Sequence, residues 1–449
     1  MAGDQSHVTN RLAQFVAGSQ WETIPSEVRR EGVRGLLNFI GCALGGAQDE
    51  AMGIAVKALA PFFGPPQGIV IGRGDRPDAL SAAFLNAVSA NVLEYDDTHL
   101  GTVMHPAAPI APGLFALAGL RPVSGRELLQ AFILGVEISC RIGLGVMPTH
   151  YRRGWHITAT CGIFGAAAAC ARLLRLDAQR TAWALGHAAT QSASLVESLG
   201  SMAKSLGVGN AAKNGLAAAL FAEGGFSGPE SPIEGRYGFA AVTSDSADLA
   251  RIADDIGQRW EVLKNAPPYP CGVVLFPAID ACLELRARAA PEAEAIDRVL
   301  VRGHPLMRER TDRPNVETGR DARVSLQHTV AAALLFGAAG LAQYEDDCVT
   351  DPAVRALRAT VVFEEDPEAP VESATVTLNL TDGTEQSEHV RHGRGTPGRP
   401  MSDAELDSKV RELAAYGAPF VDAAGLIAAV RGIEGEADPI RLLRLTVPA

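Results

Sequence analysis

The chain has 449 residues, more than a single compact core usually holds, so two domains are expected. Its formal net charge is −12, from 40 basic and 52 acidic residues, and no block of basic residues follows the pattern of a nucleic-acid binder. Composition therefore argues against nucleic acid as a partner. It leaves room for a small anionic ligand held by a few local cations.

Hydrophobic residues make up 47% of the chain and aromatic residues only 6%, which predicts a core of small side chains in closely apposed helices. The seven cysteines are scattered without a Cys-x-x-Cys pair, which argues against a zinc ribbon, a redox motif or an iron–sulfur cluster. Free thiols in a reducing cytosol are the simplest interpretation. The N-terminal residues show no secretory signal, and the uncharged Ala/Gly-rich segment 157–171 is too short to span a bilayer. We expect a cytoplasmic protein with no membrane partner.

The first half of the chain has the apolar spacing of helices. Helices are predicted over residues 8–45, 78–92, 106–118, 124–146, 157–171, 177–193 and 209–223. Residues 68–72 form a short β-like run between Pro/Gly-rich stretches, and residues 200–206 are expected to lie between helices. This pattern predicts one large helical domain.

After about residue 265 the pattern changes. β-type runs are predicted at 296–302, 359–364 and 373–380, with a hairpin-like turn at 381–383, and helices at 276–289 and 325–342. Helical segments return at 402–416 and 421–433, the first opened by a capping-box pattern of Ser402 and Glu405. The predicted fold class is a large all-α helical domain, residues 1–265, with a smaller α+β lid domain, residues 266–395. Residues 396–449 are expected to form C-terminal helices that return to the helical domain.

Polar side chains are concentrated in the stretch 91–106, between two apolar helices. It holds Glu94, Asp96, Asp97, Thr98, His99 and His105. Burying so much charge is costly unless the groups pair or bind something, although a surface loop carries it cheaply. Three further polar islands occur at 154–156, 202–206 and 264–271. A lone His or Lys is usually structural or solvated, but the repeated pattern beside small-residue helices favours a functional site.

In this order, the islands resemble the signature segments of the MmgE/PrpD family, which includes 2-methylcitrate dehydratases, cis-aconitate decarboxylases and iminodisuccinate epimerases. The resemblance is carried by Glu94-Tyr95-Asp96-Asp97-Thr98-His99 with His105-Pro106, by Gly154-Trp155-His156, by Met202-Ala203-Lys204, and by Lys264 with Tyr269-Pro270-Cys271. It spans the chain from about residue 11 to the C-terminal helices. It implies a helical domain closed by the C-terminal segment, an α+β lid and a homodimer.

The resemblance also implies a set of pocket residues. In the decarboxylases of the family an acid, a Thr, two His, two Lys and a lid Tyr line the pocket. The matching positions here are Glu94, Thr98, His105, His156, Lys204, Lys264 and His328. Glu94 stands where those enzymes carry Asp, and His328 where they carry Tyr, which weakens the case for cis-aconitate as substrate. Asp97 is a further catalytic candidate, because it could orient a histidine, and Tyr269 is a candidate for substrate binding.

These residue types suit carboxylate chemistry. Lys204 and Lys264 can hold carboxylates as point charges, and His105 and His156 can move a proton next to a carboxylate. No metal or other cofactor is expected, because cations and hydrogen-bond donors can stabilise a developing enolate. The prediction is a cofactor-independent lyase, a dehydratase or decarboxylase, for a small di- or tricarboxylate such as 2-methylcitrate or cis-aconitate. Two alternatives stay open: an epimerase of an imino- or hydroxy-dicarboxylate, and a catalytically silent binding protein.

Overall fold

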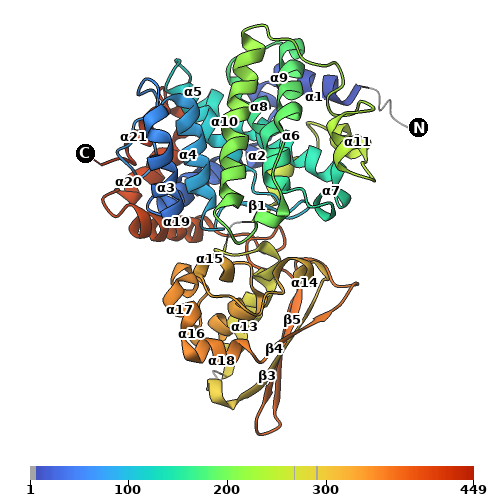
Figure 1. Ribbon diagram of the computed structural model, residues 1–449, viewed down its shortest axis with the longest axis vertical. Helices are drawn as coiled ribbons and strands as arrows, with labels where there is room; N and C mark the ends of the chain where they lie inside the picture. The colour runs from blue at the N-terminus through green and yellow to red at the C-terminus, as the bar shows by residue number, and fades with distance from the viewer. Residues whose placement is uncertain (1–6, 267, 290–291, 449) are drawn as a thin grey trace.

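The computed structural model describes residues 7–266, 268–289 and 292–448. The chain is mostly helical, with a small mixed sheet in its C-terminal half (Figure 1). Its buried apolar side chains form two separate hydrophobic cores. We call the larger, helical unit the body and the smaller α+β unit, built from residues 268–395, the lid. The fold is therefore a helical domain combined with a smaller α+β domain.

The body takes helices from both sides of the lid in the sequence, and the first and last helices of the described chain belong to it (Figure 1). Its N-terminal helices are α1 (Val8–Gly18), α2 (Ser26–Gly46), α3 (Glu50–Leu59), α4 (Ala79–Asn91), α5 (Ala107–Ala118), α6 (Gly125–Val146), α7 (Thr149–Arg152), α8 (Ile157–Leu173), α9 (Ala178–Gln191), α10 (Ala203–Glu223), α11 (Phe239–Thr243) and α12 (Leu249–Ala253). The C-terminal helices are α19 (Asp403–Gly417), α20 (Ala423–Arg431) and α21 (Ile440–Arg444). Helix α19 packs on α2, where a Cβ added at Gly41 would lie 3.0 Å from Val410 Cγ2.

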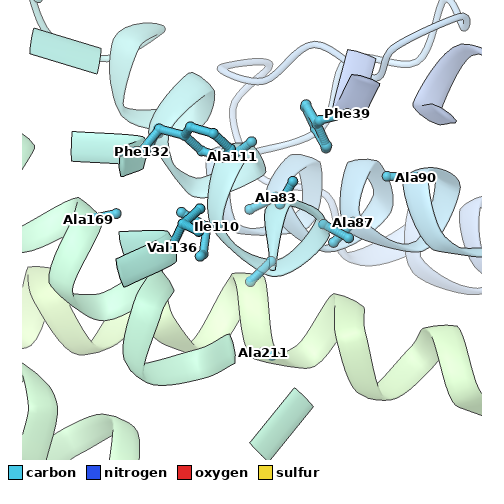
Figure 2. Close-up of a cluster of buried hydrophobic side chains, with 14 of the residues drawn as sticks. Phe39, Ala83, Ala87, Ala90, Ile110, Ala111, Phe132, Val136, Ala169 and Ala211 are labelled. Atoms are coloured by element: carbon cyan, nitrogen blue, oxygen red, sulfur yellow. The ribbon is translucent and has the colours of Figure 1, made fainter. Parts of the chain in front are cut away.

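Small residues let the central helices of the body pack closely. A Cβ added at Gly165 of α8 would lie 2.6 Å from the carbonyl oxygen of Gly135 on α6, too close for any real side chain. Figure 2 shows the same feature around α4 and α5, where alanines such as Ala83 and Ala87 meet larger side chains such as Ile110. Such close packing gains many weak dispersion contacts, which is why a chain with few aromatic residues still builds a dense core.

Helix α6 is, within the part of the chain that the structure describes, the one helix long and apolar enough to cross a membrane by length and composition. Its apolar stretch is completely buried in the body, where α6 packs against α8. The core of the body therefore accounts for the apolar character of this helix.

The lid is built on a four-stranded sheet of order β4-β3-β5-β6. Its strands are β3 (Ile296–Gly303), β4 (Val361–Glu365), β5 (Ala374–Leu380) and β6 (Glu385–Val390). Strands β3 and β4 run parallel, while β3–β5 and β5–β6 are antiparallel. The lid helices are α13 (Phe276–Ala289), α14 (Leu306–Thr311), α15 (Gly319–Ala322), α16 (Leu326–Phe336), α17 (Asp346–Thr350) and α18 (Pro352–Arg358). Apolar residues of β3 and β5 share one core with α13 and α16.

Most predicted elements are confirmed, including the three predicted strands, the turn after β5 and the capping box at Ser402 and Glu405. Three predictions are wrong in detail. Strand β6 was not predicted, because its sequence is polar and it lies at the exposed edge of the sheet. Residues 68–72 form no strand; instead the Asn86 side chain bonds the backbone of Ile69 and Ile71. Helix α10 begins at Ala203, inside the segment expected to separate two helices.

Candidate active site

The stretch between α4 and α5 is held in place at both of its ends. Asn91 Nδ2 donates a hydrogen bond to Asp96 Oδ2 at 2.8 Å, and Asp97 Oδ1 accepts one from the backbone N–H of Ala107 at 3.2 Å. Between them, strand β1 (Thr98–His99) pairs antiparallel with β2 (Asn265–Ala266). The polar side chains of this stretch are buried, so the stretch is a wall of the interior rather than a surface loop.

Two residues of this wall adopt a left-handed backbone conformation that non-glycine residues seldom use. Glu94 has a φ of 52° and Val103 a φ of 55°, and Val103 is β-branched, which makes the conformation more costly. Both residues line the same cavity. Strain of this kind persists only where the surrounding structure imposes it, and it is found most often at functional sites.

The cavity lies between the body and the lid and has a volume of about 60 Å³. From the body it is lined by Glu94, Thr98, Val103, His105, Tyr151, His156, Leu199 and Lys204, and from the lid by Gly272, Val273, Val274, Arg310, Thr311 and Val324. Because the two units contribute opposite walls, a bound ligand would contact both.

Glu94 connects the principal charged groups of the body wall. Its Oε1 is 2.5 Å from Lys204 Nζ, and its Oε2 is 3.6 Å from His105 Nε2. Burial by itself would raise the pKa of Glu94. The interactions with Lys204 and His105 lower the pKa by a larger amount, so it lies below the ordinary value. Glu94 is therefore a carboxylate at neutral pH. Lys204, in the first turn of α10, is almost completely buried beside it.

The tautomer of His105 follows from its surroundings. Its Nδ1 lies 3.1 Å from the carbonyl oxygen of Asp97, 3.2 Å from Thr98 Oγ1 and 3.2 Å from Asp96 Oδ1. Because a carbonyl oxygen only accepts hydrogen bonds, Nδ1 carries the proton in the neutral ring. The lone pair is then on Nε2, the nitrogen nearer Glu94.

His156 precedes α8 and is held by a hydrogen bond from its backbone N–H to the carbonyl oxygen of Ser194. Burial, reinforced by the positive charges of Lys204 and His105, lowers the pKa of His156 to about 3. The ring is therefore neutral over the physiological range. Its Nδ1 is buried and has no hydrogen-bond partner among the described residues. The structure thus leaves one ring nitrogen of His156 available to a hydrogen-bond partner from outside the protein.

Comparison with known proteins shows which family has this architecture. The MmgE/PrpD N-terminal domain matches residues 10–252, and the MmgE/PrpD C-terminal domain matches residues 269–434. The chain belongs to the MmgE/PrpD family. It is 26% identical over 423 residues to the cis-aconitate decarboxylase of Mus musculus, which covers 90% of this chain and 86% of the relative.

Two further relatives are similar over most of their length. The cis-aconitate decarboxylase of Homo sapiens is 25% identical over 448 residues, which is 95% of this chain and 92% of that protein. The 2-methylcitrate dehydratase of Escherichia coli (strain K12) is 26% identical over 389 residues, 79% of each chain. These relatives of the MmgE/PrpD family are lyases, and this protein is an enzyme of that type.

Five of the residues predicted for the MmgE/PrpD pocket line the cavity: Glu94, Thr98, His105, His156 and Lys204. Asp97 does not line it; its carboxylate faces the start of α5. Burial, together with the neighbouring charge of Asp96, raises the pKa of Asp97 to about 8. Asp97 therefore holds this stretch against the start of α5 instead of lining the cavity.

Lys264 also lies outside the cavity lining. Its Nζ is 2.9 Å from Glu261 Oε2, which additionally bonds His99 Nε2 at 3.0 Å, while Arg259 is 3.1 Å from the other oxygen. Burial raises the pKa of Glu261, but the bonds from His99 and Lys264 outweigh it and lower the pKa to about 2. Lys264 thus belongs to a charge network behind β1.

Tyr269 and His328 both face the interior of the lid. The Tyr269 hydroxyl donates to Asp280 Oδ1 at 2.5 Å. His328 Nε2 donates to the carbonyl oxygen of Gln343 at 2.7 Å, and its ring packs against Tyr344. Burial lowers the pKa of His328 to about 4, so the ring is neutral. Neither residue lines the cavity.

Three polar residues of the cavity were not predicted: Tyr151, Arg310 and Thr311. Arg310 occurs in a strongly charged segment, 307–313, that reads as solvated surface, so no local signal distinguishes it. Within the described residues, no group of three or more His, Cys, Asp and Glu side chains is arranged to hold a metal ion.

Proposed function

We propose that this enzyme is a lyase that acts on a small di- or tricarboxylate by moving a proton at the carbon next to a carboxylate. The observation that carries the proposal is the convergence of Lys204, His105 and His156 on one cavity. A carboxylate needs a cation, proton removal needs a base, and the resulting enolate needs a hydrogen-bond donor. The names of the relatives support the same substrate class, since 2-methylcitrate and cis-aconitate are both tricarboxylates.

In the proposed mechanism His105 is the general base. The lone pair of its Nε2 accepts the proton, and the Glu94 carboxylate, 3.6 Å away, stands where positive charge then develops. The electron pair of the broken C–H bond moves into the neighbouring carboxylate as an enolate. Lys204 holds that carboxylate and stabilises its added negative charge.

His156 supplies the second function. As a neutral imidazole it donates a hydrogen bond to the enolate without adding a competing positive charge. In a dehydration, the enolate then expels the β-hydroxyl group, which leaves as water after receiving a proton, and a carbon–carbon double bond remains. In a decarboxylation no C–H bond is broken first: carbon dioxide leaves, the electron pair of the broken C–C bond stays on the remaining carbon as a carbanion, and this carbanion takes up one proton.

The test is incubation with 2-methylcitrate, cis-aconitate and iminodisuccinate in deuterated water, followed by NMR of the products. Dehydration yields an alkene from 2-methylcitrate, decarboxylation places one deuterium in the product of cis-aconitate, and epimerisation places deuterium in iminodisuccinate without net loss of atoms. A lyase outcome supports the proposal. Epimerisation alone, or no reaction with any of the three, overturns it in favour of an epimerase or a binding protein.

Three lysine variants give the matched comparison. Lys204→Met should reduce kcat/KM by at least about 100-fold, because a hydrogen-bonded charge contact to substrate is lost. Lys213→Met, on the same helix α10 but outside the cavity, is the control and should leave kcat/KM within about twofold. Lys264→Met tests the role implied by the family resemblance, since Lys264 bonds Glu261 in this structure.

We also propose that the enzyme is a homodimer, with α3 and α10 at the contact. Ile54 and Leu206 are each more than half exposed, and together with Met202 they line a shallow apolar groove on this face. A second copy of the chain would cover it. Light scattering should give a dimer for the wild type and a shift toward monomer for Leu206→Glu. A monomeric wild type would overturn this proposal.

A further inference from the structure

Helix α14 carries Arg310 on the edge of the lid that faces the body (Figure 1). The centre of the Arg310 guanidinium is 3.9 Å from the ring centroid of Tyr151, which belongs to α7 of the body. A guanidinium at this distance over an aromatic face forms a cation–π contact. This contact connects the two units at the cavity and fixes the plane of the guanidinium.

Within the part of the chain that the structure describes, the guanidinium of Arg310 makes no hydrogen bond or ion pair. Its Nε is shielded from solvent and has no acceptor, and no acidic side chain among the described residues is within ion-pair distance of it. Arg141 shows how this fold treats a buried guanidinium, since it bonds the Glu137 carboxylate and several backbone carbonyls. Leaving a shielded charged donor unsatisfied is costly, so Arg310 is built to meet an acceptor that the protein does not supply.

The charges of the cavity indicate what that acceptor is. Lys204 is already paired with Glu94, and His156 is neutral. Arg310 is thus the cavity-lining cation, within the described chain, that no protein carboxylate neutralises. A planar guanidinium binds a carboxylate through two parallel hydrogen bonds, a geometry that an ammonium group does not offer.

We propose that Arg310 binds a second carboxylate of the substrate, remote from the one held by Lys204, and so makes the enzyme selective for polycarboxylates. The bound substrate then bridges the body and the lid, because Lys204 belongs to one and Arg310 to the other. This inference rests on the proposed function, of which it defines the specificity. Loss of Arg310 should weaken binding of substrates with several carboxylates and leave monocarboxylate binding unchanged.

The experiment measures binding of two unreactive probes, propane-1,2,3-tricarboxylate and propionate, by calorimetry with the full chain. Arg310→Met should weaken tricarboxylate binding by about 10- to 100-fold, and Arg310→Lys by less. Tyr151→Leu should weaken it about two- to fivefold through loss of the cation–π contact. Arg308→Met is the matched control: this neighbour on α14 bonds Glu365 and the carbonyl oxygen of Phe363 instead of lining the cavity, so the affinity should not change.

Different results would refute the proposed function and the inference about Arg310. If the wild type binds no tricarboxylate and converts none of the candidate substrates, the proposed function is wrong. If the wild type binds the tricarboxylate and Arg310→Met binds it equally well, the inference about Arg310 is overturned while the proposed function stands. Turnover provides a second readout, in which Arg310→Met should raise KM more than it lowers kcat. A fall in kcat alone would contradict a binding role.

Discussion

Replacement of Lys204 by Met tests the central ion pair of the cavity, because it removes the charge and keeps most of the side-chain volume. In the wild type, Lys204 Nζ lies 2.5 Å from Glu94 Oε1, and the two side chains are 3% and 13% exposed. The variant leaves the Glu94 carboxylate with His105 as its remaining close partner, at 3.6 Å. Breaking a buried pair on one side destabilises a protein because a charge is left uncompensated.

The size of the effect is limited by protonation. A buried, uncompensated charge costs about 3–5 kcal/mol. Glu94 escapes that cost by taking up a proton, and at pH 7 this costs about 3 kcal/mol for a carboxyl group of ordinary pKa, 4.5. We therefore expect Lys204→Met to lower the free energy of unfolding by about 3 kcal/mol at pH 7. For a unit of this size that corresponds to a melting temperature lower by about 3–6 °C.

The pH dependence has a definite sign. The pKa of Glu94 is lowered in the folded wild type, so the stability from the pair is present above the unfolded pKa and is lost as the pH falls through the folded one. In Lys204→Met the protonation of Glu94 costs less as the pH falls toward 4.5, so the difference in stability from the wild type should already shrink between pH 7 and pH 4. Denaturant unfolding at both pH values, together with kcat/KM, measures it.

The double variant Lys204→Met/Glu94→Gln separates stability from function. With both charges removed, it should recover most of the lost stability but none of the activity. Equal stability of the wild type and Lys204→Met at pH 7 would refute the reasoning, as would a double variant that is no more stable than the single one. Either result would mean that the Glu94–Lys204 pair does not compensate a buried charge.

Three further variants test the surroundings of the cavity. Asp97→Asn should raise the free energy of unfolding by at least about 1 kcal/mol at pH 8 and change it little at pH 4, because a folded pKa of about 8 means that the ionised carboxylate is destabilising. A larger stabilisation at pH 4 than at pH 8 in unfolding curves would contradict this. Lys409→Met should lower the free energy of unfolding by about 2–4 kcal/mol and kcat about tenfold, because it removes the 2.5 Å contact from Nζ to the carbonyl oxygen of Tyr95, next to Glu94. Unchanged kinetics would contradict that coupling. His328→Tyr should lower the free energy of unfolding by about 1–3 kcal/mol through overpacking and loss of the bond to Gln343, and it should leave the activity on cis-aconitate no higher than that of the wild type. A higher activity would show that the side chain at this position reaches the substrate.

The predictability of the fold follows the strength of the local signals. Helices with a clear apolar period were predicted within a few residues, and the Ser402 capping box marked the start of α19. Strand β6 gave no such signal, because an edge strand with polar side chains on both faces has no alternating pattern. The run at 68–72 has the sequence pattern of a strand, but the Asn86 side chain of the following helix, α4, takes the backbone hydrogen bonds of Ile69 and Ile71. That choice depends on tertiary structure.

The site divides in the same way. Motifs located Glu94 and Lys204, because acids and lysines between apolar helices are rare enough to stand out. A motif gives the position of a residue in the chain but not the direction of its side chain. Lys264 was therefore predicted to line the cavity, whereas its side chain bonds Glu261 outside it. Arg310 has the opposite problem, because its importance arises only when the lid meets the body and leaves its guanidinium without an acid.

The placement of α19 on α2 has a consequence for the order in which the protein is made. The ribosome releases the whole lid before residue 403, so the lid can acquire its own core while the groove along α2 at Gly41 is still open to water. Only when α19 emerges does Val410 close that groove and Lys409 reach the carbonyl oxygen of Tyr95. The cavity wall that carries Glu94 is therefore completed last, after the C-terminal helices have packed on the body.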